Sequence, residues 1–509
     1  MMGKQPPREP KLFYYDVCLE GRVPQEHLLR KIQAVVDFDF TYGLVQDRYG
    51  VNGNVSVPPP TLMRMMLVLF LYDVRSEREL MESIPYRMDW LWFLGYDLDS
   101  EIPDHSILSK ARSRWGVEVF ETLFARVVAQ CVAAGLVNGR KIHVDGSLVD
   151  AHASNNSVLK GSEGLIDQLK EQLRSETAKL EELPSEPQPH SAPPLPRKGT
   201  KKYYQPKNRG MVSTTDPDAT IVSKGPHGPR ARYKNHRVVD DRCGVITAVK
   251  TTSGDVEENA KLMELVDQHE ANTQCQTETV VADKQYGTVE NFRACWQRGL
   301  RSHMADLLVA QMKKPQCQGI FGIDQFVYDP KTDTYRCPAG QTLTRRKHKK
   351  QRQAYEYACA GSVCWACSIR SQCTRAKGKV ARTIKRHYDQ EAIDLARQQS
   401  HSPAARRDRQ RRKWLMEGSF GDAATRHGFK HARWRRLWRQ QIQDFLIATV
   451  QNIRTLVRSL GKRLRGACSE AQSEAILAAE GLVVSLLFWS GVFGRCCTPV
   501  GRSRHGIRP

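Results

Sequence analysis

The spacing of apolar residues changes near residue 140 of the chain. Before this point they recur every three or four positions, and TLMRMMLVLFLYDV and RSERELMESI predict one buried and one amphipathic helix. After it, KIHVDGSLVDA alternates with period two, which is typical of a strand with one face on a core. We therefore expect a helical region over 1–138 and a strand-rich region over 139–460.

The order of elements in the strand-rich region predicts a mixed sheet. NHRVVDD and CGVITAVKTT form a hairpin around the turn DDRCG, and a helix over 257–269 follows. The apolar run ETVVADKQYG, a helix over 289–298 and a short strand near Leu300 come next. These elements indicate a mixed five-stranded α/β sheet with helices rather than a parallel repeat.

Two segments interrupt this sheet. Residues 155–235 contain a helix and then PSEPQPHSAPPLP, whose six prolines predict a linker, and residues 310–400 contain a cysteine cluster. The helix is amphipathic through Leu165, Leu169, Leu173 and Leu180. A final core helix is predicted by the spacing of Ile442, Phe445, Leu446, Val450, Ile453, Leu456, Val457 and Leu460.

The N-terminal helical region has two interpretations. IPDHSILSKARSRW begins with Pro103 and Asp104, a good helix cap, and continues as a short basic helix. Short helices that end in a basic one suit a helix-turn-helix DNA-binding domain. A plain helical bundle fits the pattern equally well.

Composition adds an expected partner. The net charge is +23, and a chain this basic favours a polyanion, most simply DNA, with a membrane surface as the weaker alternative. Residues 401–440 contain twelve Lys and Arg against three acids. The candidate DNA-binding residues are Arg406, Arg407, Arg409, Arg411, Arg412, Lys413, Lys430, Arg433, Arg435 and Arg436.

The termini suggest a cytoplasmic protein with no membrane span. The start, MMGKQPPREPKLF, has no apolar signal region. The apolar window Ile476–Gly494 is about long enough to span, but it contains Glu480, which favours a packed or degenerate tail within residues 461–509. In a reducing compartment, clustered cysteines more often bind metal than form disulfides.

The cysteine cluster has spacing suited to zinc. CPAG is followed by CAGSVCWACSIRSQC, in which a C-x₂-C pair has further cysteines close by. We favour Cys337, Cys364, Cys367 and Cys373 as zinc ligands, with Cys359 as the spare. The alternative is a set of unrelated structural thiols. A structural zinc ion would brace an insertion that has little apolar content of its own.

Three acidic residues are candidates for a catalytic metal site. Asp145 and Asp283 each follow an apolar strand, and Glu417 is an acid inside a basic helical stretch. Singly, each has an ordinary explanation, as a solvated strand end or a helical ion pair. Together they fit carboxylates that hold two divalent cations for phosphodiester chemistry. The rival carboxylates are Asp150, Asp240, Asp241 and Asp216, of which Asp216 is predicted to be a turn residue.

The chain resembles bacterial insertion-sequence transposases of the DDE type, most closely the IS1182 group. The resemblance covers residues 12–460 and includes IHVDGSLVDAHAS, VVADKQYGTVENF and MEGSFGDAATRHGFKHARWRRLWRQQIQDFLIATVQNI. It implies an RNase H-like catalytic core in which Asp145, Asp283 and Glu417 bind Mg²⁺ or Mn²⁺. It also implies DNA cleavage at terminal inverted repeats, joining of the 3′ ends to target DNA, and a homodimer or larger assembly.

The chain departs from the family pattern at several positions. Gln285 stands where relatives have glycine, and Gln410, Lys413 and Ala424 replace a Tyr, an Arg and a basic residue around Glu417. The basic role is left to Arg412, Arg426 or Lys430. Two other functions stay open: a zinc-containing DNA-binding protein without catalysis, and an RNase H-like nuclease that cuts without joining.

Overall fold

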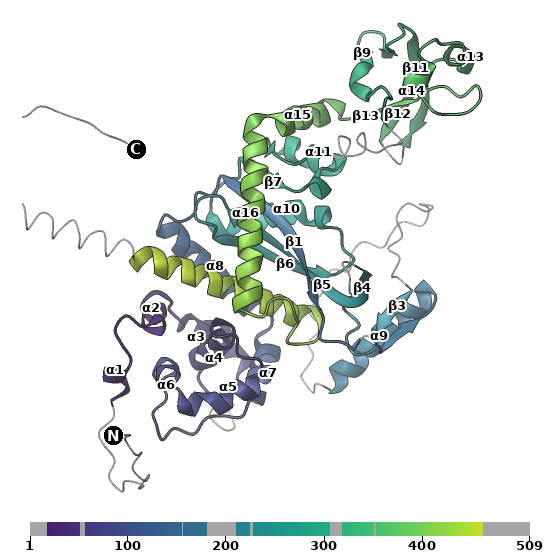
Figure 1. Ribbon diagram of the computed structural model, residues 1–509. Helices are drawn as coiled ribbons and strands as arrows, with labels where there is room; N and C mark the ends of the chain where they lie inside the picture. The colour runs from purple at the N-terminus through teal and green to yellow at the C-terminus, as the bar shows by residue number, and fades with distance from the viewer. Residues whose placement is uncertain are drawn as a thin grey trace, which may run out of the picture. The chain divides into compact units, whose positions relative to one another are not determined.

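The computed structural model describes residues 18–50, 56–154, 156–180, 210–223, 228–305, 318–350 and 353–461 (Figure 1). By its contacts the chain divides into a unit over Met1–Arg454 and a second unit over Thr455–Pro509. Everything below concerns the first unit. The proline-rich PSEPQPHSAPPLP segment, the Leu180 side chain and the apolar window Ile476–Gly494 lie outside the described residues.

The N-terminal region is helical, as predicted. Its α-helices are α1 (Leu19–Arg22), α2 (Leu28–Val35), α3 (Phe40–Val45), α4 (Pro59–Leu71), α5 (Glu77–Ser83), α6 (Met88–Leu94), α7 (Ser106–Trp115) and α8 (Glu118–Ala133). Helix α4 is buried along almost its whole length, and α5 buries only Leu80 and Met81. The predicted buried and amphipathic helices are therefore confirmed.

Helix α7 buries one of its basic residues, Arg112. The N-cap residue of α7 is His105 rather than Asp104, but the Asp104 carboxylate still accepts a hydrogen bond from the Ser106 amide in the first turn over 2.8 Å. Arg112 is 1% exposed, forms an ion pair with Glu77 of α5, and lies 3.8 Å from the ring centroid of Trp434. An arginine held this way cannot reach a DNA groove, and the packing favours a helical bundle.

The main sheet has the strand order β6-β5-β1-β7-β8. Its strands are β1 (Lys141–Asp150), β5 (Pro229–Asp240), β6 (Ile246–Ser253), β7 (Thr279–Ala282) and β8 (Arg301–Ser302). Strand β5 runs antiparallel to β1 and β6, whereas β1, β7 and β8 are parallel. The predicted mixed sheet is confirmed and is consistent with an RNase H-like core. A sixth strand, β4 (Thr220–Ser223), also pairs with β5.

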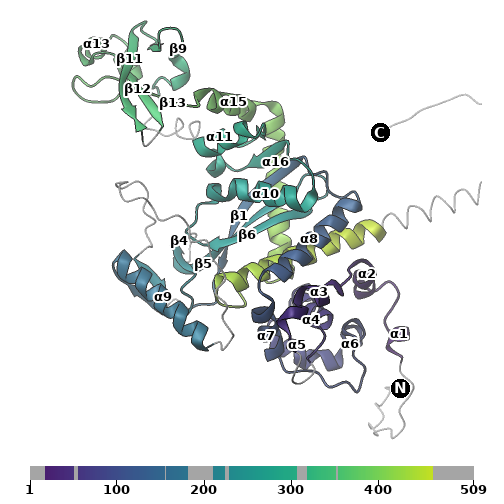
Figure 2. The same ribbon diagram turned by 180° about the vertical axis from the view of Figure 1, so that it is seen from behind.

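Helices cover both faces of this sheet (Figures 1 and 2). They are η3 (Glu258–Lys261), α10 (Leu262–Thr273), η4 (Lys284–Tyr286), α11 (Val289–Gln297), α15 (Gln390–His401) and α16 (Pro403–Arg426). Helix α10 packs against β5 and β6, and its Leu262 and Leu265 join Ile142 and Val144 of β1 in one core. Helix α16 packs against β1 and β7. In Figure 1 it crosses in front of β1, and in Figure 2 it lies behind the sheet.

Two expectations about β1 are wrong: that only one of its faces is packed, and that it ends at Asp145. His143 is fully buried and lies 2.8 Å from an Asp241 carboxylate oxygen, so both faces of the strand are packed at this point. Asp145 does not end the strand, because pairing with β5 continues to Asp150. What ends near Asp145 is the pairing with β7, whose last partners are Val144 and Ala282.

The first interrupting segment forms α9 (Glu163–Leu180), β2 (Val158–Lys160) and β3 (Met211–Ser213). The predicted helix is confirmed, but its apolar face differs from the prediction. Ile166 is fully buried, whereas Leu165 is 50% exposed. The leucines therefore do not form one continuous buried stripe.

The cysteine-rich segment is a small antiparallel sheet in the order β13-β12-β11-β10-β9. Its strands are β9 (Val327–Asp329), β10 (Thr334–Arg336), β11 (Thr342–Lys349), β12 (Ala354–Ala358) and β13 (Ile384–His387), with the short helices α13 (Gly361–Trp365) and α14 (Arg370–Cys373). The predicted end at residue 400 is too late, because α15 packs on α11 and β8 of the main sheet.

Residues 437–461 form the last described helix. Its predicted core face is confirmed within the first unit by the burial of Ile442, Phe445, Leu446, Val450 and Ile453. Leu456, Val457 and Leu460 belong to the second unit. Within the described ranges, none of the helices combines the length and apolar character that a membrane span needs.

Candidate active site

Strands β1 and β7 place two of the predicted acids at matching positions. Val144 pairs with Ala282, so Asp145 and Asp283 are the next residues along two neighbouring parallel strands. Side chains at matching positions of parallel strands project to the same face, and neighbouring strands are about 4.8 Å apart. The charge of Asp283 also contributes to a raised pKa of Asp145, after burial and against Arg412. The structure therefore brings these two carboxylates together.

Asp145 is held by a cationic group from α16. An Arg412 guanidinium nitrogen donates to Asp145 Oδ2 over 2.7 Å, and the Gly146 amide donates to Oδ1 over 2.9 Å. Burial raises the pKa of Asp145 above its ordinary value, and Arg412 opposes that shift. Among the three basic residues left open by the sequence, Arg412 is the one that contacts an acid of the site.

Glu417 is not joined to this pair. It is exposed on α16 and forms no hydrogen bond or ion pair with any residue in the described part of the chain. Successive residues turn about 100° around a helix, so Glu417 lies about 140° around α16 from Arg412, the residue that contacts Asp145. As placed, Glu417 therefore faces away from Asp145 and Asp283.

As placed, the acids do not form a closed metal cage. In the ranges that the structure describes, no group of three or more His, Cys, Asp or Glu side chains could hold a metal ion. Asp283 Oδ1 accepts from the Lys284 amide over 2.6 Å, and none of the described residues contacts its other oxygen through a hydrogen bond. Carboxylate oxygens of this kind are the ligands that Mg²⁺ and Mn²⁺ prefer.

The rival carboxylates are engaged elsewhere. Asp150 bonds to Arg230 and Arg232, and Asp240 accepts from backbone amides of residues 138 and 139. Asp241 bonds to His143 and Arg411. Asp216 begins a turn, as predicted, because the Ala219 amide donates to its carbonyl over 3.2 Å. Its side chain is nevertheless fully buried, where it accepts from the Tyr233 hydroxyl over 2.7 Å and from the Arg436 amide.

The candidate DNA-binding residues separate into two groups. Arg406, Arg407 and Lys413 are exposed on α16. The others have partners within the chain, and Arg436 is buried; they are Arg409, Arg411, Arg412, Lys430, Arg433, Arg435 and Arg436. The high frequency of Lys and Arg in this part of the sequence could not show which of these side chains face solvent.

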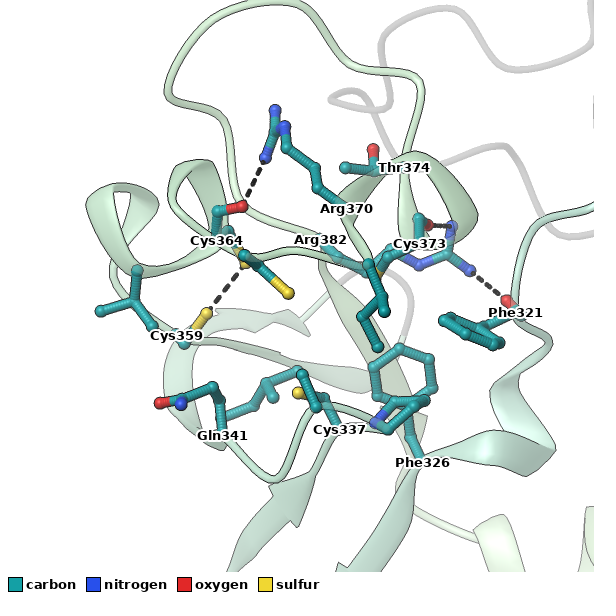
Figure 3. A pocket seen from close by; sticks show the side chains of 16 residues that line it. Phe321, Phe326, Cys337, Gln341, Cys359, Cys364, Arg370, Cys373, Thr374 and Arg382 are labelled. Carbon is teal, nitrogen blue, oxygen red and sulfur yellow. Dashed lines mark hydrogen bonds between the residues drawn. The ribbon is translucent and has the colours of Figure 1, made fainter.

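The five cysteines of the insertion that lie in the described ranges line one small pocket (Figure 3). Cys337 follows β10, Cys364 lies in α13 and Cys373 ends α14, so the sheet and both short helices contribute. Burial raises the pKa of Cys373; Arg382 opposes this, and Cys364, Cys337 and Cys367 add to it. The Cys359 and Cys364 sulfur atoms are 3.0 Å apart.

Two parts of the chain match known domain families. Residues 17–114 match a transposase domain (DUF772), and residues 336–457 match a transposase DDE domain. The chain carries a transposase DDE domain. Such transposases are enzymes that bind DNA and use divalent metal ions. The second match includes Glu417 and strands β11, β12 and β13 of the cysteine-rich sheet, whereas Asp145 and Asp283 lie outside both matches. No curated protein matches the chain.

The sequence pattern did not identify Glu258 as a candidate site residue, although Glu258 lies near Asp145. It is the second of two adjacent glutamates, and only this one is buried. No periodic signal distinguishes the pair, because their burial depends on how η3 meets β1.

Proposed function

We propose that this chain is the transposase of an insertion sequence, with the IS1182 group as the closest family. It would cut DNA at the terminal inverted repeats and join the freed 3′ ends to target DNA. One observation carries the proposal: Asp145 and Asp283 follow the last paired residues of adjacent parallel strands in an RNase H-like sheet. The transposase DDE domain match supports the assignment.

Three acids would hold the metal in this proposal. Asp145 and Asp283 would supply the central carboxylates, and Glu417 of α16 would complete the site once its side chain is turned toward them. When bound, Mg²⁺ or Mn²⁺ activates the attacking oxygen and stabilises the leaving oxygen of the phosphodiester. Arg412 already supplies a positive charge at Asp145, which supports a cation-binding role for that carboxylate.

DNA would be held mainly by exposed cations. Arg406, Arg407 and Lys413 lie on the helix that also carries Glu417, so phosphate contacts and chemistry would share one rigid element. Two ends must be cut in a coordinated way, which suggests a homodimer or larger assembly.

The cysteine pocket would hold a structural zinc ion. Cys337, Cys364, Cys367 and Cys373 are the proposed ligands on the spacing of the C-x₂-C pair and its neighbours, and all four line the same pocket, as Cys359 also does. Four thiolates suit Zn²⁺, which would brace a sheet with a small apolar core.

A strand-transfer assay tests the proposed function. The full chain would be incubated with Mg²⁺, labelled DNA carrying the ends that flank its reading frame, and a target plasmid. We expect labelled ends covalently joined to the plasmid. Cleavage without joining would instead support a nuclease. Binding without cleavage would support a DNA-binding protein that has no catalytic activity.

A further inference from the structure

Gly146 leaves a space beside Asp145 that Glu258 fills. A Cβ atom on Gly146 would stand 2.9 Å from Glu258 Cγ and 3.0 Å from its Cδ. Real Cβ atoms essentially never approach another atom within 3.0 Å, so any side chain at position 146 would displace Glu258 from this place. The glutamate side chain is only 9% exposed. The chain thus buries a carboxylate against the residue next to Asp145.

Glu258 and Asp145 approach this point from opposite faces of the sheet. Side chains alternate along a strand, so position 146 faces α10 with Ile142 and Val144, whereas Asp145 faces α16. Pairing with β7 ends at Val144 and Ala282, and among the described residues this edge of β1 is next paired at Asp150, which bridges to His431. Groups from both faces can therefore meet beside Asp145.

The Tyr286 hydroxyl provides a second, independent observation. Tyr286 is fully buried, and its hydroxyl has no hydrogen-bond partner among the described residues. Burial raises its pKa, the charges of Glu258, Asp145 and Asp283 raise it further, and the charge of Arg412 opposes them. Buried hydroxyl groups are nearly always hydrogen-bonded. The unpaired Tyr286 hydroxyl thus lies in a polar region near these acids, which could accommodate a cation or its bound water.

Specific contacts hold Glu258 in this place. The Asn291 side-chain amide donates to the carbonyl of Asn259 over 3.1 Å and to that of Tyr286 over 2.9 Å. It thereby ties η3, which carries Glu258, to η4 directly after Asp283. Lys234 lies 4.0 Å from Glu258 Oε1 and balances part of its charge.

We propose that Glu258 is a fourth carboxylate of the metal site and would bind the divalent cation together with Asp145 and Asp283. As placed, the three carboxylates do not yet form a group that encloses an ion, so their side chains would have to turn toward the cation when it binds. The acid comes from η3, directly before α10, outside the Asp-Asp-Glu set that the sequence suggests. The cation class rests on the proposed function, whereas the position of Glu258 does not.

Mn²⁺ binding to the full chain tests this proposal. Binding would be measured by electron paramagnetic resonance of free Mn²⁺ in the wild type, Glu258→Gln and Glu257→Gln. Glu257 is the exposed neighbour, so its variant is the matched control. We expect Glu258→Gln to weaken Mn²⁺ binding by about tenfold or more, since even outer-shell changes cost that much. Glu257→Gln should bind as the wild type does.

Further readouts separate a ligand from a structural residue. Glu258→Asp keeps the charge and should bind more tightly than Glu258→Gln, and the Mn²⁺ concentration for half-maximal DNA cleavage should rise in the same order. Wild-type Mn²⁺ affinity in Glu258→Gln, with or without a lower melting temperature, would overturn the proposal. Metal binding that depends on Asp145 and Glu258 without any DNA cleavage would instead contradict the proposed function alone.

Discussion

At the scale of single residues, Asp216 is the carboxyl group whose behaviour the fold changes most clearly. It is fully buried and accepts hydrogen bonds from the Tyr233 hydroxyl and the Arg436 amide. Its Oδ2 atom has no partner among the described residues. Burial therefore dominates, and the pKa of Asp216 rises to about 6.

This shift predicts a pH-dependent stability. The folded chain binds the Asp216 proton more tightly than the unfolded chain, so stability should fall as pH rises from about 4 to about 6. Asp216→Asn keeps an acceptor for Tyr233 and removes the titration. We expect this variant to be more stable than the wild type at pH 7, by up to about 3 kcal/mol, and nearly equal at pH 4.

Melting temperatures at four pH values between 4 and 7 check this prediction. Asp218→Asn is the matched control, because Asp218 lies two residues away and contacts Arg174 and the Leu437 amide. Parallel pH profiles for wild type and Asp216→Asn would show that Asp216 does not titrate in this range.

At the scale of elements, variants of α7 test whether the N-terminal region is a DNA-binding helix-turn-helix domain or a plain helical bundle. Arg112→Ala should lower the free energy of unfolding by about 3–5 kcal/mol, because it leaves Glu77 half-buried without its cation. Lys110→Ala, on the exposed side of the same helix, should change it by less than about 0.5 kcal/mol. Urea unfolding measures both. If Arg112→Ala keeps its stability and loses only DNA binding, α7 is a reading helix.

The cysteine-rich sheet makes a separate prediction about metal content. Purified wild type should contain one zinc ion per chain by elemental analysis, and so should Cys359→Ser. Cys373→Ser should lose most of it, because Cys373 lies among the other three proposed ligands. Chelation should lower the melting temperature of the wild type. Equal zinc loss in both serine variants would show that Cys359 is a ligand.

At the scale of the whole molecule, the net charge of +23 predicts DNA binding that weakens steeply with salt. Arg406→Ala and Arg407→Ala should each reduce the slope of log affinity against log salt by about 0.9. Arg298→Ala is the control, since Asp267 already compensates that charge. Titrations of labelled DNA at several salt concentrations give the slopes. Unchanged slopes would place the phosphate contacts elsewhere.

The local features of the chain could be predicted from its sequence, whereas the features that depend on contacts between distant residues could not. Asp145 and Asp283 could be found because each follows an apolar run, and the strand order then brings them together. The burial of β1 on both faces could not be predicted, because α16, which covers one of these faces, lies more than 250 residues later in the chain. The burial of Glu258 and Asp216 has the same cause: each is fixed by its partner across the fold, not by its neighbours in sequence.

A cleavage assay with matched acid variants tests the central claim most directly. Wild type, Asp145→Asn, Asp283→Asn, Glu417→Gln and the exposed control Glu290→Gln would be given Mg²⁺ or Mn²⁺ and DNA carrying the element ends. The account predicts metal-dependent cuts at the ends by wild type and Glu290→Gln. It predicts at least a hundredfold slower cleavage by the other three with DNA binding intact, about 3 kcal/mol of barrier. Full cleavage by Asp145→Asn or Asp283→Asn would contradict it.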